Sequence, residues 1–197
     1  FGRGRRIRDL YQRVTAPGRS SVILYYGQSG VGKSSLLDAG LAPRLEVTHA
    51  VFYARRDRAL GLLGTLQQQL AASVTDLTAS PSTSPAAGPA PAPAVLLQAW
   101  LAAEARLGKP LVLILDQVEE VFSRRNPDQP HELEEFAAAL GALEGGPNKP
   151  AGVLLLGFRK ERLAEIEAAL RACRADFAKL FLEPLDVEGI QEIFWGP

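Results

Sequence analysis

A glycine-rich segment with a lysine and neighbouring serines holds the residue types that bind a phosphate chain. Residues 27–35 read Gly-Gln-Ser-Gly-Val-Gly-Lys-Ser-Ser, with two glycines separated by four residues and followed by lysine and a hydroxyl residue. In such a loop, successive backbone N–H groups and the start of the next helix point at the phosphates. The residues expected to contact phosphate are Gly27, Gln28, Ser29, Gly30, Val31, Gly32, Lys33, Ser34 and Ser35.

Two side chains of this segment are suited to the chemistry of a nucleotide phosphate. The Lys33 ammonium would reach the β- and γ-phosphates, and the Ser34 hydroxyl offers an oxygen to Mg²⁺. Because Mg²⁺ keeps most of its waters and takes few protein ligands, we expect one carboxylate in addition to this hydroxyl.

Acidic residues follow the aliphatic run 111–115 and could supply that carboxylate. The run ends in Asp116, and Glu119 and Glu120 follow within four residues, which is a Walker B arrangement. We expect Asp116 to hold Mg²⁺ through its water shell, so the predicted metal ligands are Ser34 and Asp116. Either Glu119 or Glu120 could polarise the water that attacks the γ-phosphate. An alternative is that these acids only form the first turn of a helix, where its dipole favours them.

A basic residue follows the apolar run 152–157. Arg159 is predicted to lie near the carboxyl edge of the sheet, where its guanidinium could donate two hydrogen bonds to a terminal phosphate and so sense it. The alternative is that Arg159 and Lys160 solvate the start of the next helix.

Other polar residues predict less chemistry. The charged runs 55–58 and 123–125 are expected to be solvated surface, although the first could meet the nucleotide of a neighbouring subunit. His49 and His131 have no partners at ligand spacing, so no metal other than Mg²⁺ is expected. The single cysteine, Cys173, lies in a helical pattern and is expected to pack.

The elements that must position these residues alternate along the chain. Short apolar runs predict five strands, at 21–26, 51–54, 111–115, 152–157 and 179–182. Helical patterns separate them at 34–41, 60–72, 95–107, 131–143 and 161–175. This alternation predicts an α/β fold of three layers, with a five-stranded, mainly parallel sheet and helices on both faces. Ligands of such sheets bind at the carboxyl ends of the strands.

Length and composition limit the classes of protein. A chain of 197 residues forms about one domain, and 22 basic against 22 acidic residues leave no net charge to attract nucleic acid. No apolar run approaches the ~20 residues of a membrane helix, and no signal peptide is visible, so a cytoplasmic protein without membrane contact is expected.

Two features concern the limits of the domain. Residues 78–94 hold five prolines in 17 residues and no charge, which predicts a disordered surface insertion. The chain begins with Phe1 and contains no Met, so we expect residues 1–197 to be the core of a larger protein.

The motifs together resemble a known family. The strings Phe-Gly-Arg at residues 1–3, Gly-Gln-Ser-Gly-Val-Gly-Lys-Ser-Ser-Leu-Leu-Asp-Ala-Gly-Leu-Ala-Pro at 27–43, and Leu-Asp-Gln-Val-Glu-Glu-Val-Phe at 115–122 are similar to those of the bacterial novel-STAND NTPases. These are P-loop signal-transduction ATPases with numerous domains, related to the NACHT and NB-ARC switches. Many P-loop ATPases carry glutamate directly after the Walker B aspartate, but this chain has Gln117, which leaves the catalytic base open between the two glutamates and predicts slow hydrolysis.

The resemblance carries further expectations. It implies ATP and ADP as ligands, contacts from Phe1, Gly2 and Arg3 to the base and ribose, and the start of a helical lid at residues 185–197. It also implies a flanking effector, a flanking repeat sensor and an ATP-dependent homo-oligomer. The leading hypothesis is therefore a slow ATPase switch for signalling or defence. A nucleotide-binding scaffold without turnover and a P-loop kinase of a small molecule are the alternatives, and a nucleic-acid motor is disfavoured by the neutral charge.

Overall fold

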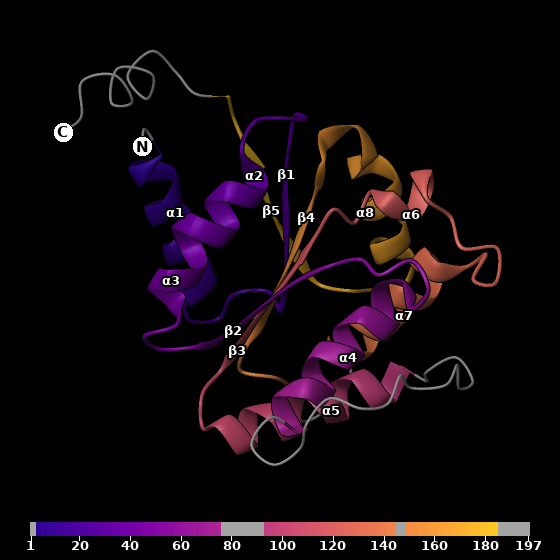
Figure 1. Ribbon diagram of the computed structural model, residues 1–197, viewed down its shortest axis with the longest axis horizontal. Coiled ribbons are helices and arrows are strands. Elements are labelled where there is room, and N and C mark those ends of the chain that lie inside the picture. Colours follow the sequence, from indigo (N-terminus) through magenta and orange to yellow (C-terminus); the bar gives the residue numbers. More distant parts are fainter. Residues whose placement is uncertain (1–2, 76–92, 145–148, 185–197) are drawn as a thin grey trace.

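The computed structural model describes residues 3–75, 93–144 and 149–184. They form three layers, with one sheet between two layers of helices (Figure 1). The strands are β1 Val22–Gly27, β2 Ala50–Arg55, β3 Leu111–Asp116, β4 Val153–Arg159 and β5 Phe177–Leu182. Their order in the sheet is β2-β3-β4-β1-β5, and each of the four pairings is parallel. The expected α/β fold with a five-stranded parallel sheet is confirmed.

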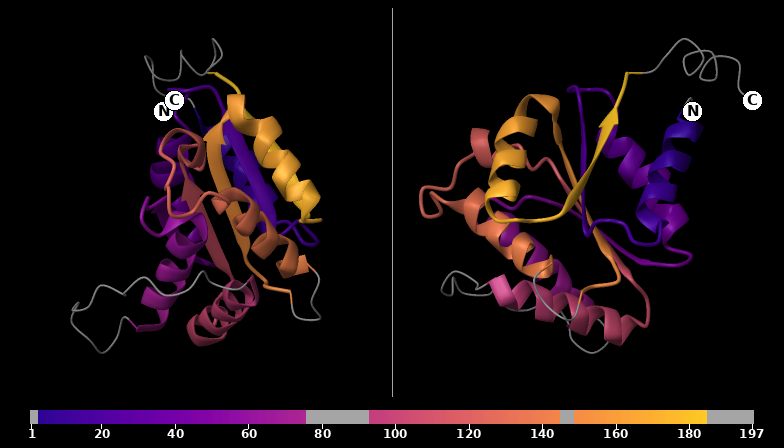
Figure 2. Two further views of the ribbon diagram at one scale, coloured as in Figure 1. Left: turned by 90° about the vertical axis from the view of Figure 1, so that its right-hand side faces the viewer. Right: turned by 180° about the vertical axis from the view of Figure 1, so that it is seen from behind.

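Helices cover both faces of the sheet (Figure 2). One face is covered by α1 Gly4–Thr15, α2 Lys33–Ser35, the π-helix η1 Leu36–Leu41 and α3 Ala42–Leu45. The other is covered by α4 Gly61–Thr75, α5 Pro93–Leu107, α7 Glu132–Glu144 and α8 Leu163–Ala172. The short elements α6 Glu120–Ser123 and η2 Lys160–Arg162 follow the carboxyl ends of β3 and β4. Within the described ranges, no helix has the length and apolar character needed to cross a membrane.

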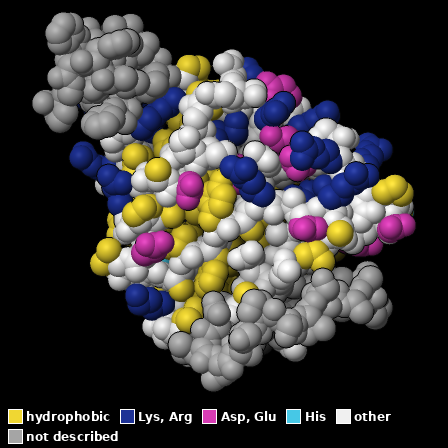
Figure 3. Space-filling model, in the orientation of Figure 1, with side chains coloured by type: hydrophobic (Ala, Val, Ile, Leu, Met, Phe, Trp, Pro, Cys, Tyr) yellow, Lys and Arg dark blue, Asp and Glu magenta, His cyan; other side chains and the backbone are white. Residues whose placement is uncertain are grey.

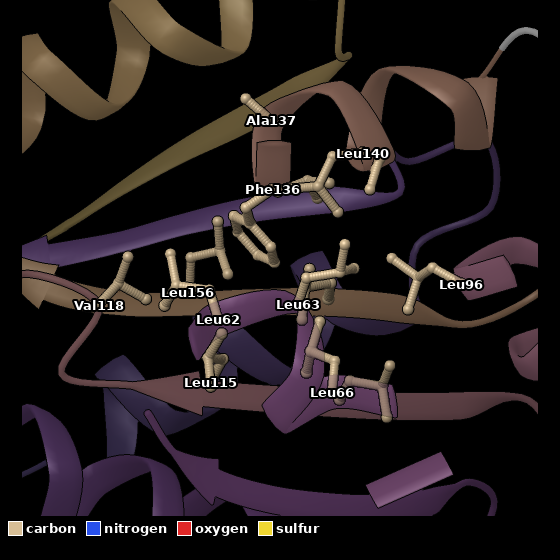
Figure 4. Packing of buried hydrophobic residues seen from close by; sticks show 14 of the residues in the cluster. Leu62, Leu63, Leu66, Leu96, Leu115, Val118, Phe136, Ala137, Leu140 and Leu156 are labelled. Atoms are coloured by element: carbon tan, nitrogen blue, oxygen red, sulfur yellow. The ribbon is translucent and has the colours of Figure 1, made fainter. Parts of the chain in front are cut away.

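Strand β3 shows why the sheet is buried on both sides. All six of its residues are buried, and their side chains alternate between two hydrophobic cores. Leu113 and Leu115 belong to the larger core, where Figure 4 shows Leu115 among side chains from α4 and α7, including Leu62 and Phe136. Val112 and Ile114 belong to the smaller core under α1, η1 and α3. An uninterrupted aliphatic run is typical of a central parallel strand for this reason.

Some expected elements differ from the structure. The helix expected at 34–41 is present, but it is α-helical only to Ser35 and continues as the π-helix η1, a difference that a short apolar pattern cannot predict. Gly40 lies there in close contact with Ile7 of α1, an element that the apolar pattern did not predict, and an added Cβ would come within 2.9 Å of the Ile7 side chain. The helix expected at 161–175 ends at Ala172, because Arg174 adopts a left-handed φ of 56°.

Two expected segments fall largely outside the described residues. The Pro/Ala-rich insertion lies there except for residues 93–94, which begin α5, and the expected lid segment 185–197 lies there entirely.

Candidate functional site

A cavity of about 290 Å³ lies at the carboxyl ends of β1, β3 and β4. Three segments that are far apart in the sequence form its wall: the glycine-rich loop, the end of β3 and the end of β4. Its lining residues are Ser29, Gly30, Gly32, Lys33, Ser34, Ser35, Asp116, Gln117, Glu119 and Arg159. The parallel topology therefore brings the expected phosphate, metal and sensor residues to one place.

Backbone conformation explains the glycines of the loop. Gly30 and Gly32 have φ values of 74° and 89°, in the left-handed region that residues with a Cβ rarely adopt. Gly27 is needed for a different reason, since an added Cβ would lie 2.7 Å from the Leu182 carbonyl oxygen.

The Lys33 side chain lies across this loop. Its Nζ donates hydrogen bonds to the carbonyl oxygens of Gly27 at 3.0 Å and Gln28 at 2.9 Å, and only 9 % of the residue is exposed. Burial lowers the pKa of Lys33, while the nearby carboxylates of Glu119 and Asp116 oppose that shift. The Lys33 ammonium could therefore exchange its hydrogen bonds to the Gly27 and Gln28 carbonyls for stronger ones to a phosphate.

Asp116 is 1 % exposed and accepts three hydrogen bonds. Ser34 Oγ donates to its Oδ2 at 2.5 Å, the Tyr53 hydroxyl donates to the same oxygen at 2.7 Å, and the backbone N–H of Gln117 donates to Oδ1 at 2.9 Å. A carboxylate beside a hydroxyl is a hard oxygen donor set that fits Mg²⁺. The described residues contain no cluster of three or more His, Cys, Asp or Glu that could hold a metal ion.

Glu119 and Arg159 form an ion pair at the cavity, with Arg159 Nε 3.1 Å from Glu119 Oε1. The second carboxylate oxygen, Oε2, is buried and has no hydrogen-bond partner among the described residues. Burial raises the pKa of Glu119, and the positive charges of Arg159 and Lys33 act against that rise. Phe158 is fully buried in the larger core, so alternation along β4 turns Arg159 to the face on which Asp116 lies.

Glu120 is placed differently from Glu119. It pairs with Arg124 at 3.2 Å and lines an adjoining cavity of about 590 Å³, whereas Glu119 lines both cavities. Basic and acidic side chains are interspersed at this part of the surface, at the upper right of Figure 3. Of the two candidate bases, Glu119 is therefore the one beside Lys33 and Asp116.

Arg3 reaches the same loop from the N-terminal side. Its guanidinium donates to the carbonyl oxygens of Val31 at 2.7 Å and Glu183 at 2.9 Å, and Arg6 forms an ion pair with Glu183. Arg3 thus joins the phosphate loop to the exit of β5. Phe1 and Gly2, which were expected to contact the base, lie outside the described residues.

The expectation for residues 55–58 as a solvated run was wrong at one position. Arg56 is 6 % exposed and forms a buried ion pair with Glu132, because the turn after β2 directs its side chain under α7. In contrast, the Arg124 side chain is 67 % exposed, as expected. Cys173 is partly buried and packs against the larger core, so its predicted packing role is confirmed.

Sequence reasoning did not identify Tyr53 as part of the site. Tyr53 lies in a short strand of apolar residues, where an aromatic side chain is typical of core packing. Only the pairing of β2 with β3, which places Arg55 opposite Asp116, shows that the hydroxyl can reach the carboxylate.

The fold and the loop together define a P-loop NTPase. More particularly, the family model for Novel STAND NTPase 1 matches residues 1–197, and the chain belongs to this family. None of the curated proteins matches the chain.

Solved structures similar to this one include two of the Aeropyrum pernix ORC2 protein. The ADP form has a TM-score of 0.59 and 18 % identity over 97 % of this chain and 50 % of that one. The ADPNP–ADP complexes have a TM-score of 0.53 and 18 % identity over 98 % and 50 %. Rif2 in complex with the C-terminal domain of Rap1 has a TM-score of 0.52 and 11 % identity over 94 % and 55 %. The chain thus spans about half the length of these structures, and at such identities the likeness shows the fold alone.

Proposed function

We propose that this chain is the ATP-binding and slowly hydrolysing switch domain of a larger signalling protein. The observation that carries the proposal is the Glu119–Arg159 pair beside the phosphate loop, with one buried carboxylate oxygen left without a partner. A terminal phosphate entering the cavity would offer Arg159 a second anion. Glu119 would then be released to bind water through Oε2.

Several residues of the cavity have roles in this proposal. Lys33 exchanges its loop carbonyls for β- and γ-phosphate oxygens, and the N–H groups of residues 28–35 bind the phosphate chain. Ser34 and Asp116 would hold Mg²⁺, which supplies charge neutralisation for the phosphates. Glu119 accepts the proton of the attacking water, so its carboxylate must be ionised. The γ-phosphoryl group is transferred to that water, and ADP is the leaving group.

The wider organisation is part of the same proposal. We place the base and ribose near Phe1, Gly2 and Arg3, because Arg3 already contacts the phosphate loop. We also propose that residues 185–197 lead into the lid, since the Arg3 and Arg6 contacts with Glu183 would couple it to the loop. A bound nucleotide can shift such a switch only by binding one state more tightly than the other, and this is how assembly with further copies would depend on ATP.

A scaffold that binds nucleotide without turnover is the second candidate. Gln117 directly after Asp116 favours it, because the position where many P-loop ATPases carry a glutamate holds an amide that cannot act as a base. The two candidates predict the same binding and differ in hydrolysis.

Two experiments test the proposal. Calorimetric titration with ADP and with a slowly hydrolysed ATP analogue, both with Mg²⁺, should show binding by the parent chain and its loss in Lys33→Ala. In the full-length protein, Glu119→Gln should lower the turnover rate by about 10²–10⁴ while nucleotide Kd stays unchanged. Glu120→Gln is the matched control and should retain turnover.

Three outcomes would contradict it. No binding by the full-length parent would remove the nucleotide site. Equal turnover by Glu119→Gln and the parent would remove Glu119 as the base. Binding without measurable hydrolysis by the parent would favour the scaffold.

A further inference from the structure

The hydroxyl of Tyr53 lies against the Asp116 carboxylate although the two residues belong to different strands. Tyr53 lies on β2 opposite Ile114 of β3, two residues before Asp116, on the face that carries α2. Its ring packs against the smaller core, and its hydroxyl donates to Asp116 Oδ2 at 2.7 Å. The tyrosine ring is therefore long enough to carry the hydroxyl from the position opposite Ile114 to the carboxylate of Asp116, two residues further along β3 on the same face.

The surroundings of Asp116 leave its carboxylate little freedom. Oδ1 accepts the Gln117 N–H and faces Gly157 of β4, where an added Cβ would lie 2.6 Å from that oxygen. Oδ2 accepts two hydroxyl groups, those of Ser34 and Tyr53. Since the Ser34 proton points to Asp116, the lone pairs of Ser34 Oγ are left for a cation.

The Tyr53 hydroxyl is a reliable donor. A phenol can donate one hydrogen bond, and its partner here, the ionised Asp116 carboxylate, can only accept. A hydroxyl that donates to a carboxylate makes a stronger hydrogen bond than one that donates to a neutral oxygen.

We propose that Tyr53 is a positioning residue for the Mg²⁺ site: its hydroxyl holds Asp116 Oδ2 in the orientation in which Asp116 and Ser34 together bind the cation. This inference rests on the proposed nucleotide-binding function. Groups that hydrogen-bond to metal ligands set the orientation of those ligands, and their loss weakens metal affinity by about 10- to 100-fold.

A second buried tyrosine provides a matched control. Tyr25 lies on β1 with 2 % exposure, and its hydroxyl has no hydrogen-bond partner in the described part of the chain. Tyr25→Phe removes the same atom from the same sheet without removing a hydrogen bond to Asp116.

The test is a Mg²⁺ titration of nucleotide binding. A fluorescent ATP analogue is held at fixed concentration with the parent, Tyr53→Phe or Tyr25→Phe, and the half-saturating Mg²⁺ concentration is measured. Binding of the same analogue in EDTA and the thermal unfolding midpoint are recorded for each protein. Tyr53→Phe should need about 10-fold or more Mg²⁺, with unchanged binding in EDTA, while Tyr25→Phe should match the parent.

The possible results separate this inference from the proposed function. If the parent binds the analogue and Tyr53→Phe needs no more Mg²⁺ than the parent, the role of Tyr53 is overturned and the proposed function stands. If Tyr53→Phe weakens binding equally in EDTA and in Mg²⁺, the residue supports the fold rather than the metal, which also overturns the role. If the parent does not bind the analogue in either condition, the proposed function fails and the inference fails with it.

Discussion

The buried ion pair between Arg56 and Glu132 offers a quantitative test of the packing behind the site. The Arg56 side chain is 0 % exposed and that of Glu132 6 %, and two hydrogen bonds join them, at 2.7 Å from Nε to Oε1 and 2.5 Å from Nη2 to Oε2. The pair has two further partners: Arg56 Nη1 donates to the Arg124 carbonyl at 3.0 Å, and Glu132 Oε1 accepts from the Leu62 N–H at 2.7 Å. It thus joins the starts of α4 and α7 to the end of α6, the helix that follows Glu119.

The two single variants together should lose more free energy of unfolding than the double variant, because each single variant leaves one buried charge without its partner. Arg56→Met leaves the Glu132 carboxylate buried with only the Leu62 N–H as donor among the described residues, and breaking a buried pair in this way costs about 3–5 kcal/mol of the free energy of unfolding. Glu132→Leu strands the guanidinium at a similar cost. In the double variant no buried charge is left, and the unpaired Arg124 carbonyl and Leu62 N–H cost about 1–3 kcal/mol each. At the middle of these ranges each single variant and the double variant lose about 4 kcal/mol, so we expect a coupling energy of about 4 kcal/mol.

Urea unfolding of the parent, both single variants and the double variant measures this coupling. The exposed pair of Arg13 and Asp9 on α1, with side chains 51 % and 46 % exposed, is the control, and the same cycle there should give a coupling below about 0.5 kcal/mol. Additive losses at Arg56 and Glu132, or single variants that lose less than about 1 kcal/mol, would refute the reasoning.

Two further predictions concern the site itself. Gly157→Ala should weaken Mg²⁺-dependent nucleotide binding by about tenfold or more, because its Cβ would displace Asp116 Oδ1. Gly4→Ala is the control and should bind as the parent does, because an added Cβ there meets nothing within 4 Å. Calorimetry measures both affinities, and equal values for the two variants would contradict the close confinement of the Asp116 carboxylate. The second prediction concerns pH: burial raises the pKa of Glu119, and a base must be ionised, so turnover should fall as pH decreases through that raised value. Arg159→Ala removes a charge that opposes the rise and should move this limb to higher pH in the profile of kcat/KM, which reports the nucleotide-free protein; a limb that stays in place would show that Glu119 is not the base.

The phosphate loop can be predicted from the local sequence alone. Gly30 and Gly32 need positive φ, and Lys33 and Ser34 follow them directly, so residues a few positions apart specify this part of the site. The strand that ends in Asp116 is equally visible, because six consecutive buried residues leave an aliphatic run with a carboxylate at its end.

The tertiary structure decided which of Glu119 and Glu120 lines the cavity with Lys33. Both follow Asp116 within four residues, but the turn after β3, in which Gln117 has a φ of 61°, directs Glu119 to Lys33 and Glu120 to Arg124. Two neighbouring residues in a short irregular turn point in different directions, and the pattern of apolar and polar residues does not predict which of them faces the cavity.

The amino-acid sequence by itself determined the alternation of strands and helices from residue 21 onward, the phosphate loop and the position of Asp116 at the end of its strand, because each depends on local periodicity and backbone conformation. The tertiary structure decided that Tyr53 contacts Asp116 and that Arg56 is buried against Glu132. These contacts join residues 63 and 76 positions apart. They depend on the pairing of β2 with β3 and on the packing of α7 over the loop after β2. Such contacts are properties of assembled elements, and neither a tyrosine in an apolar strand nor an arginine in a charged run carries a local sign of them.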